Sequence, residues 1–189
     1  MFGWLAARSA SLCRGASHIV VSKRSGPITP HALIQMLPGL GSVLYLHTTS
    51  DAAASSAWLP GIVLAQREFA PLLDTHWLIA TSIVTDDGPR EWCECVDRFG
   101  RTRTRWHLLP DTDYLAWDAL TASCLAHSDV PGPIDVQPWR PDHASVVNFR
   151  LRETAGLLIL EQNAPAALSP LGDRIAARIA QAESAVLQP

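Results

Sequence analysis

Residues 76–109 read HWLIATSIVTDDGPREWCECVDRFGRTRTRWHLL, three runs typical of β-strands with a turn signal after each of the first two. The segment DDGP at 86–89 favours a turn between the first and second runs. Gly100 suits the left-handed position of a three-residue hairpin loop between the second and third. The pattern therefore predicts a three-stranded antiparallel meander.

The segments before the meander alternate between helix and strand signals. Thr29-Pro30 has the cap-then-proline order of a helix start, and Pro38-Gly39 stops that helix after about two turns. The runs at 42–48 and 60–66 are rich in β-branched and other apolar residues, which favours strands. We expect a further short strand at 17–22.

The segments after the meander predict a second helical layer. A helix begins after Asp113 and places Trp117, Leu120 and Cys124 on the side toward the sheet. A proline-rich arm follows at 131–141, and the runs at 144–162 are too short to decide between strand and helix. Ser169-Pro170 starts a C-terminal helix with one apolar stripe, formed by Leu171, Ile175, Ile179, Ala182 and Val186.

The totals favour one folded domain. The chain has 189 residues, 48% apolar and 17% charged, enough to bury a core. We expect an α+β fold, an antiparallel meander covered by helices on one face with a C-terminal helix. Residues 1–130 would form the domain, and 131–189 would pack on it as arm, short element and amphipathic helix.

Charge and hydropathy exclude two classes of partner. A net charge of −3 and a pI near 6.1 argue against a protein whose main partner is nucleic acid. No apolar run reaches the roughly 18 residues of a membrane-spanning helix, and the N-terminus is a poor signal peptide. We expect a soluble, cytoplasmic protein without membrane insertion.

The third strand of the meander carries arginines at alternate positions. Because side chains alternate between the faces of a strand, Arg101, Arg103 and Arg105 are expected on one face. With a loop at 98–100, Trp92 would pair with Trp106 on the buried face. The arginine row is suited to an anionic ligand such as a dicarboxylate. The alternative is a wet sheet face, with Glu91, Asp97 and water around the guanidinium groups.

The histidines and cysteines show no metal-site spacing. His76 begins a strand, which is typical of a packed or hydrogen-bonded residue. His143 lies at the end of the proline-rich arm, where a side chain is able to reach a ligand or to stay solvated. Cys93 and Cys95 share one strand face, either as buried thiols or as a reactive pair near the arginines.

Three segments carry a family resemblance: MLPGLGSVLYLHT at 36–48, GIVLAQREFAPLLDTHW at 61–77 and VDRFGRTRTRWHLLPDTDYLAWDALTA at 96–122. In order and spacing they resemble the cytoplasmic haem-utilisation proteins of bacterial haem uptake, the haem-carrier and hemin-degrading family. The likeness covers roughly residues 33–127, one structural repeat of a family often built from two. The chain departs from the family at 48–50, where Thr-Thr-Ser replaces Arg-Asn-Glu.

The resemblance implies haem as the ligand and an axial histidine just past a proline-rich linker, where Asp142-His143 stands. Haem binding or intracellular haem trafficking is thus the function expected, with His143 as the iron ligand. The candidate ligand-binding residues are Arg101, Arg103, Arg105, His76 and Trp106.

Two other interpretations stay open. In the first, the chain is a degenerate repeat without haem that acts through a homodimer or another partner, docking by its C-terminal helix. In the second, an enzyme acts on a small carboxylate through Cys93 or Cys95. The absence of common nucleotide-binding and hydrolase motifs makes a catalytic role the less favoured one.

Overall fold

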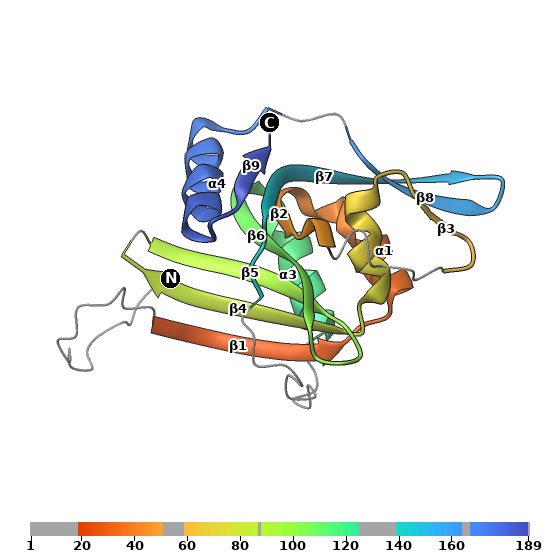
Figure 1. The fold of residues 1–189 in the computed structure, drawn as a ribbon, viewed down its shortest axis with the longest axis horizontal. Helices are drawn as coiled ribbons and strands as arrows, with labels where there is room; N and C mark the ends of the chain where they lie inside the picture. The colour runs from red at the N-terminus through yellow and green to blue at the C-terminus, as the bar shows by residue number, and fades with distance from the viewer. Residues whose placement is uncertain (1–18, 51–58, 87, 125–138, 164–166, 189) are drawn as a thin grey trace.

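A nine-stranded sheet is the centre of the protein (Figure 1). The computed structural model describes residues 19–50, 59–86, 88–124, 139–163 and 167–188. The strands are β1 (Ile19–Pro27), β2 (Gly41–His47), β3 (Ile62–Leu64), β4 (Trp77–Thr85), β5 (Gly88–Val96), β6 (Thr102–Thr112), β7 (His143–Thr154), β8 (Leu157–Gln162) and β9 (Val186–Gln188). The helices are α1 (Pro30–Met36), α3 (Tyr114–Cys124) and α4 (Pro170–Ala182), with 3₁₀ segments η1 (Leu37–Leu40) and η2 (Arg67–Asp74).

The strand order is β1-β4-β5-β6-β2-β7-β8-β3, with β9 pairing with β7. The pairs β3–β8 and β7–β9 are parallel, and the other pairs are antiparallel. The predicted α+β class and the β4-β5-β6 meander are confirmed. Residues 144–162, which the sequence left between helix and strand, form most of β7 and β8.

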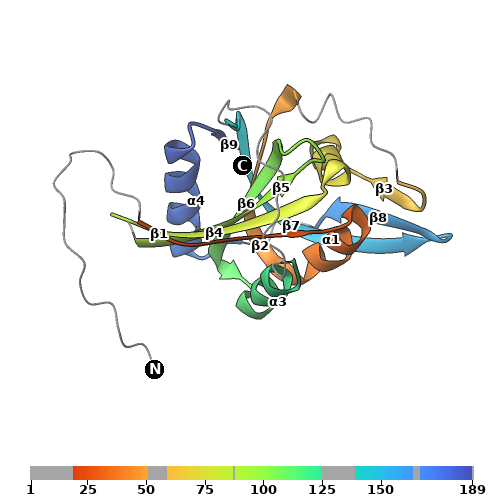
Figure 2. The ribbon, with the colours of Figure 1, turned by 90° about the horizontal axis from the view of Figure 1, so that it is seen from below.

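Helices cover both faces of the sheet, as Figure 2 shows with α1 and α3 on one side and α4 on the other. Along β2, Val43 and Tyr45 belong to the larger apolar cluster, whereas Leu44 and Leu46 belong to a second one. We call the first side the α3 face and the second the α4 face. α1 and α3 cover one face of the sheet, as predicted, and the C-terminal helix α4 covers the opposite face.

The helices begin where capping residues predict. Thr29 Oγ1 accepts a hydrogen bond from the Ala32 amide at 3.2 Å, which caps α1. Asp113 Oδ1 accepts from the amides of Leu115 and Ala116 at the start of α3. These hydrogen bonds satisfy amides that have no partner within the helix, which is why the sequence locates both starts.

α4 is anchored to β6 at its N-terminus. Ser169 Oγ accepts a hydrogen bond from the Gly172 amide, and Ser169 itself donates through its amide and hydroxyl to the Asp111 carboxylate. The buried residues of α4 are Gly172, Ala176, Ile179 and Ala180. The predicted stripe is therefore wrong in part: Leu171 is half exposed, and Val186 lies in β9 beyond the helix.

The C-terminal part of the chain completes the same sheet. β7 lies beside β2, with His143 opposite His47 and Asn148 opposite Ser42. Residues 131–138 of the predicted arm at 131–141 lie outside the described residues. Among the residues that the structure describes, no helix is long and apolar enough to cross a membrane.

Candidate functional site

A β-bulge in the β5–β6 hairpin sets the direction of the arginine side chains. Gly100 has a φ of 79°, and its amide donates to the Asp97 carbonyl, which closes the predicted three-residue loop. Beyond the loop, Val96 pairs with Thr102 but Cys95 pairs with Thr104, so Arg103 is an extra residue without a partner position on β5.

The bulge shifts the register by one residue and overturns the predicted side-chain pairs. Cys93 lies opposite Trp106, and Trp92 lies opposite His107. The predicted pairing of Trp92 with Trp106 is therefore wrong. A one-residue shift moves side chains to the other face, so Trp92 lies on the α4 face together with Arg105.

Trp106 does not line a ligand surface. Its side chain has 0% exposure and packs in the larger cluster with Cys93 and Cys95, which are also fully buried. This burial gives no support to the prediction of Trp106 as a ligand-binding residue. Neither cysteine forms a disulfide, and burial at 0% keeps both away from a reagent in solvent.

The three arginines do not form one row. Arg101 is exposed beside the hairpin loop, with its guanidinium carbon 5.5 Å from the Phe99 ring centroid. Arg103 lies near Asp74 of η2, with 3.7 Å between its Nη2 and the Asp74 Oδ2. Arg105 is directed to the opposite, α4 face. The predicted common face is thus wrong, because the bulge falls inside the row.

Arg105 is held by two carboxylates. Its Nε and Nη2 donate to Glu94 Oε1 at 3.1 and 2.6 Å, and its Nη1 donates to Glu183 Oε1 at 2.6 Å. The guanidinium carbon lies 5.4 and 5.3 Å from the ring centroids of Trp92 and Trp139. This is a mostly buried ion pair, which differs both from the predicted ligand-binding row and from the wet-face alternative with Glu91, Asp97 and water.

A column of aromatic and imidazole rings ends β2 and begins β7. Tyr45 and His47 are stacked with ring centroids 5.5 Å apart, and His47 and His143 are stacked at 5.5 Å with a 29° interplanar angle. His47 is 5% exposed, whereas His143 is half-buried. The Nδ1 atom of His143 lies 3.3 Å from the side-chain nitrogen of Gln188 in β9.

The surroundings of His47 favour a neutral imidazole. Burial lowers the pKa of His47, the neighbouring His143 lowers it further, and Asp142 opposes the shift. The Nδ1 atom of His47 is buried and has no hydrogen-bond partner in the described part of the chain. Burial raises the pKa of Asp142, but hydrogen bonds from Thr49 and the nearby His143 outweigh it and lower that pKa.

Three predicted residues, His143, Arg103 and His76, lie at the same end of the sheet, on or beside different strands. His47 lies opposite both His143 and Thr104, and Thr104 follows Arg103 in the chain. His76 is exposed immediately before β4, and its Nδ1 lies 2.9 Å from the carbonyl oxygen of Asp74, whose carboxylate lies near Arg103. We call this region, with His47, His143, Arg103 and His76, the histidine end of the sheet.

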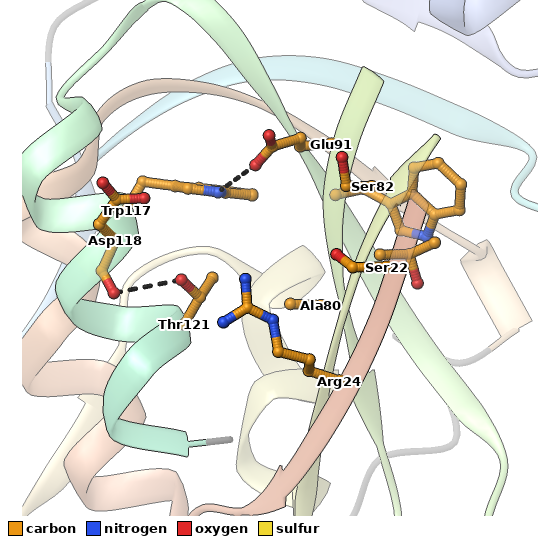
Figure 3. Close-up of a pocket in the computed structure, with 10 residues that line it drawn as sticks. Ser22, Arg24, Ala80, Ser82, Glu91, Trp117, Asp118 and Thr121 are labelled. Carbon is orange, nitrogen blue, oxygen red and sulfur yellow. Dashed lines mark hydrogen bonds between the residues drawn. The ribbon is translucent and has the colours of Figure 1, made fainter. Parts of the chain in front are cut away.

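Two hollows lie elsewhere on the sheet. The first, about 180 Å³, lies between the sheet and α3 and is lined mainly by polar residues (Figure 3). There Trp117 Nε1 donates to Glu91 at 3.2 Å, and Arg24 points toward Thr121 and Asp118. The second, about 430 Å³, lies on the α4 face beside Trp92 and His107. His143 lines neither hollow.

Sequence reasoning missed His47 and Glu183. His47 was one of seven histidines without motif spacing, and its contact with His143 depends on the β2–β7 pairing, for which the sequence has no local signal. In the described part of the chain, no group of three or more His, Cys, Asp or Glu residues is placed to hold a metal ion. A haem iron needs only one or two protein ligands, so this finding leaves the haem expectation untested.

The chain matches no protein-family model and no curated protein. The haem expectation therefore depends on the residues themselves.

Proposed function

We propose that the protein binds haem and takes part in intracellular haem trafficking, with His143 as the axial ligand of the iron. The observation that carries the proposal is the stacked His47–His143 pair at the histidine end of the sheet. A neutral imidazole is a common protein ligand of haem iron.

The contacts of His143 suit ligation through its Nε2 atom. A metal-binding histidine usually has a partner at its second ring nitrogen, which fixes the ring orientation and the tautomer. Gln188 is such a partner for Nδ1, because its amide group is able to present oxygen or nitrogen at that position. The Nε2 atom has no hydrogen bond from the residues that the structure describes, and the side chain is half-buried.

The rings behind His143 form a firm support. His47 stacks against it, Tyr45 stacks against His47, and the Tyr45 hydroxyl donates to the Glu68 carbonyl at 2.8 Å. Phe69 and Phe149 contact Tyr45 edge-on from η2 and β7. The position of His143 is therefore determined by packed neighbours, as a preorganised ligand site requires.

Cations at the same end of the sheet would meet the propionates. Arg103 is oriented by Asp74, and Arg101 and His76 are exposed nearby. Guanidinium groups bind carboxylates through paired hydrogen bonds. Arg105 has no part in this proposal, since Glu94 and Glu183 already hold it.

The exposure of His143 favours transport over turnover. Because His143 lines neither hollow, the porphyrin would lie at the end of the strands where β7 begins between β2 and β9. A haem held at the strand ends, outside an enclosed cavity, would exchange readily with a donor or an acceptor. We therefore propose a carrier without a catalytic step.

Hemin titration followed by the Soret band tests the proposal. We expect a band shift for the wild type, binding weaker by about tenfold or more for His143→Ala, and weaker binding for Gln188→Ala. His31→Ala, which removes an exposed histidine of α1, is the matched control and should behave as the wild type. No shift with the wild type would refute haem binding, and a shift unchanged in His143→Ala would refute the assigned ligand.

The second interpretation is that a partner or a second copy docks on the C-terminal helix. The packing of α4 gives this interpretation little support. Its residues Ala176, Ile179 and Ala180 are buried against Leu44 and Leu46 of the chain's own sheet. Analytical ultracentrifugation separates the two interpretations. A stable dimer that does not shift the Soret band of hemin would favour the docking protein.

A further inference from the structure

The hollow on the α4 face has the features of a binding site separate from the histidine end. Its volume is about 430 Å³, within the range of pockets for small organic ligands. Strands β1, β4, β5 and β6 and the end of α4 contribute to it. Its chemically distinctive lining residues are Lys23, Arg90, Trp92, Glu94, His107 and Glu183.

His107 is a buried side chain of the hollow whose ring nitrogens lack hydrogen bonds among the described residues. Its side chain is 3% exposed, and neither ring nitrogen has a hydrogen-bond partner among the residues that the structure describes. The nearest carboxylate oxygen, Glu183 Oε1, is 3.9 Å from Nε2, which is beyond hydrogen-bond distance. Buried polar groups without a partner are rare in folded proteins, and a bound ligand is one explanation for them.

The imidazole of His107 is neutral at pH 7. Burial lowers its pKa well below the usual value, and the cations Arg105 and Arg90 lower it further. A neutral imidazole has one donor nitrogen and one acceptor nitrogen. It therefore suits a ligand that carries a hydroxyl, carbonyl or carboxylate oxygen.

The charges around the hollow favour an anion. Glu94 and Glu183 are both engaged by Arg105, so these three side chains carry one net negative charge. Lys23 and Arg90 add two positive charges, so the four charged lining residues balance, and the set carries one positive charge in excess when Arg105, which holds both glutamates from outside the lining, is counted. Lys23 is exposed and forms no ion pair with the residues that the structure describes.

The walls of the hollow suit a flat apolar body. Trp92 and His107 place their rings 5.6 Å apart at a 39° angle, and Ile83 and Ala182 add apolar surface. Aromatic side chains bind planar ligands by stacking and by excluding water. The arrangement is thus aromatic on one side and cationic at the rim.

We propose that this hollow binds a small aromatic monocarboxylate, with its ring against Trp92, its carboxylate at Lys23 and Arg90, and an oxygen within reach of His107. This function goes beyond haem binding, because Trp92 and His107 lie on the α4 face whereas His47 and His143 lie on the α3 face. The two sites are therefore separable by substitution.

1-Naphthoate is a suitable probe, with the uncharged 1-naphthalenemethanol as its matched control. Titration calorimetry on the full chain should show binding of the acid and at least about tenfold weaker binding of the alcohol, because the charged contacts are lost. Lys23→Gln should weaken naphthoate binding by about tenfold, whereas Arg24→Gln, on the other face of the same strand, should leave it unchanged.

Lys23 is the only lysine of the chain, which allows a second measurement without a substitution. Naphthoate should slow acetylation of Lys23 by an amine reagent, followed by mass spectrometry, and the alcohol should not. Equal binding of acid and alcohol, equal effects of Lys23→Gln and Arg24→Gln, or no naphthoate binding would overturn the proposal. Naphthoate binding should persist in His143→Ala, so failure of haem binding does not decide this test.

Discussion

Removal of the Arg105 side chain tests the account of the β5–β6 hairpin. Arg105 is 14% exposed and donates two hydrogen bonds to Glu94, which is 13% exposed, and one to Glu183, which is 27% exposed. In Arg105→Ala both carboxylates lose their cation, and the stacking on Trp92 and Trp139 is lost.

The expected cost follows from this burial. Breaking a fully buried ion pair by removing one partner costs about 3–5 kcal/mol, and exposed pairs contribute less than about 1 kcal/mol. Because these groups are mostly but not fully buried, we expect Arg105→Ala to lower the free energy of unfolding by about 2–3 kcal/mol. Arg101→Ala, at an exposed position of the same hairpin, should change it by less than about 0.5 kcal/mol.

Urea denaturation followed by far-UV circular dichroism measures both values by linear extrapolation. A double-mutant cycle with Glu183→Gln should give a coupling of about 1 kcal/mol between Arg105 and Glu183. If Arg105→Ala and Arg101→Ala lowered the free energy of unfolding equally, the assignment of Arg105 to an internal ion pair would be refuted. Arg105 would then again be a candidate ligand-binding residue.

Three further changes test other parts of the fold. Because the pKa of His107 is lowered in the folded protein, the unfolded chain takes up a proton at this histidine at a higher pH than the folded chain does. The free energy of unfolding should therefore fall as pH drops below 6.5. His107→Gln should flatten this pH dependence in urea titrations at several pH values. Gly100→Ala should cost about 1 kcal/mol by thermal denaturation because Gly100 has a positive φ, and no loss would argue against the loop geometry. Ser169→Ala should cost about 1–2 kcal/mol, since both the cap on Gly172 and the hydroxyl contact with Asp111 are lost; a loss under about 0.3 kcal/mol would contradict that anchoring.

Local signals were sufficient for the elements but not for their register. The break between β4 and β5 falls within the predicted turn segment, although Gly88 and Pro89 already belong to β5. Gly100 and the caps Thr29 and Ser169 also mark boundaries that the structure confirms, because each acts within a few residues of itself. The bulge at Arg103 has no such signal, since its position depends on how β6 meets both β2 and β5.

The sequence also brought out only some residues of the candidate site, for the same reason. The sequence singled out His143, Arg103 and His76, and the structure places all three at one end of the sheet. It also singled out Trp106 and Arg105, whose environments are set by the shifted register. The contact of His47 with His143 could not be predicted, because it depends on the pairing of β2 with β7, which are far apart in the sequence.

Hemin-loaded protein with His143 replaced by glycine tests the central claim most directly, because added imidazole is able to take the place of the missing side chain. We expect the Soret band of His143→Gly to differ from that of the wild type and to return to the wild-type position when imidazole is added. Identical bands for the two proteins, with no response to imidazole, would contradict ligation by His143.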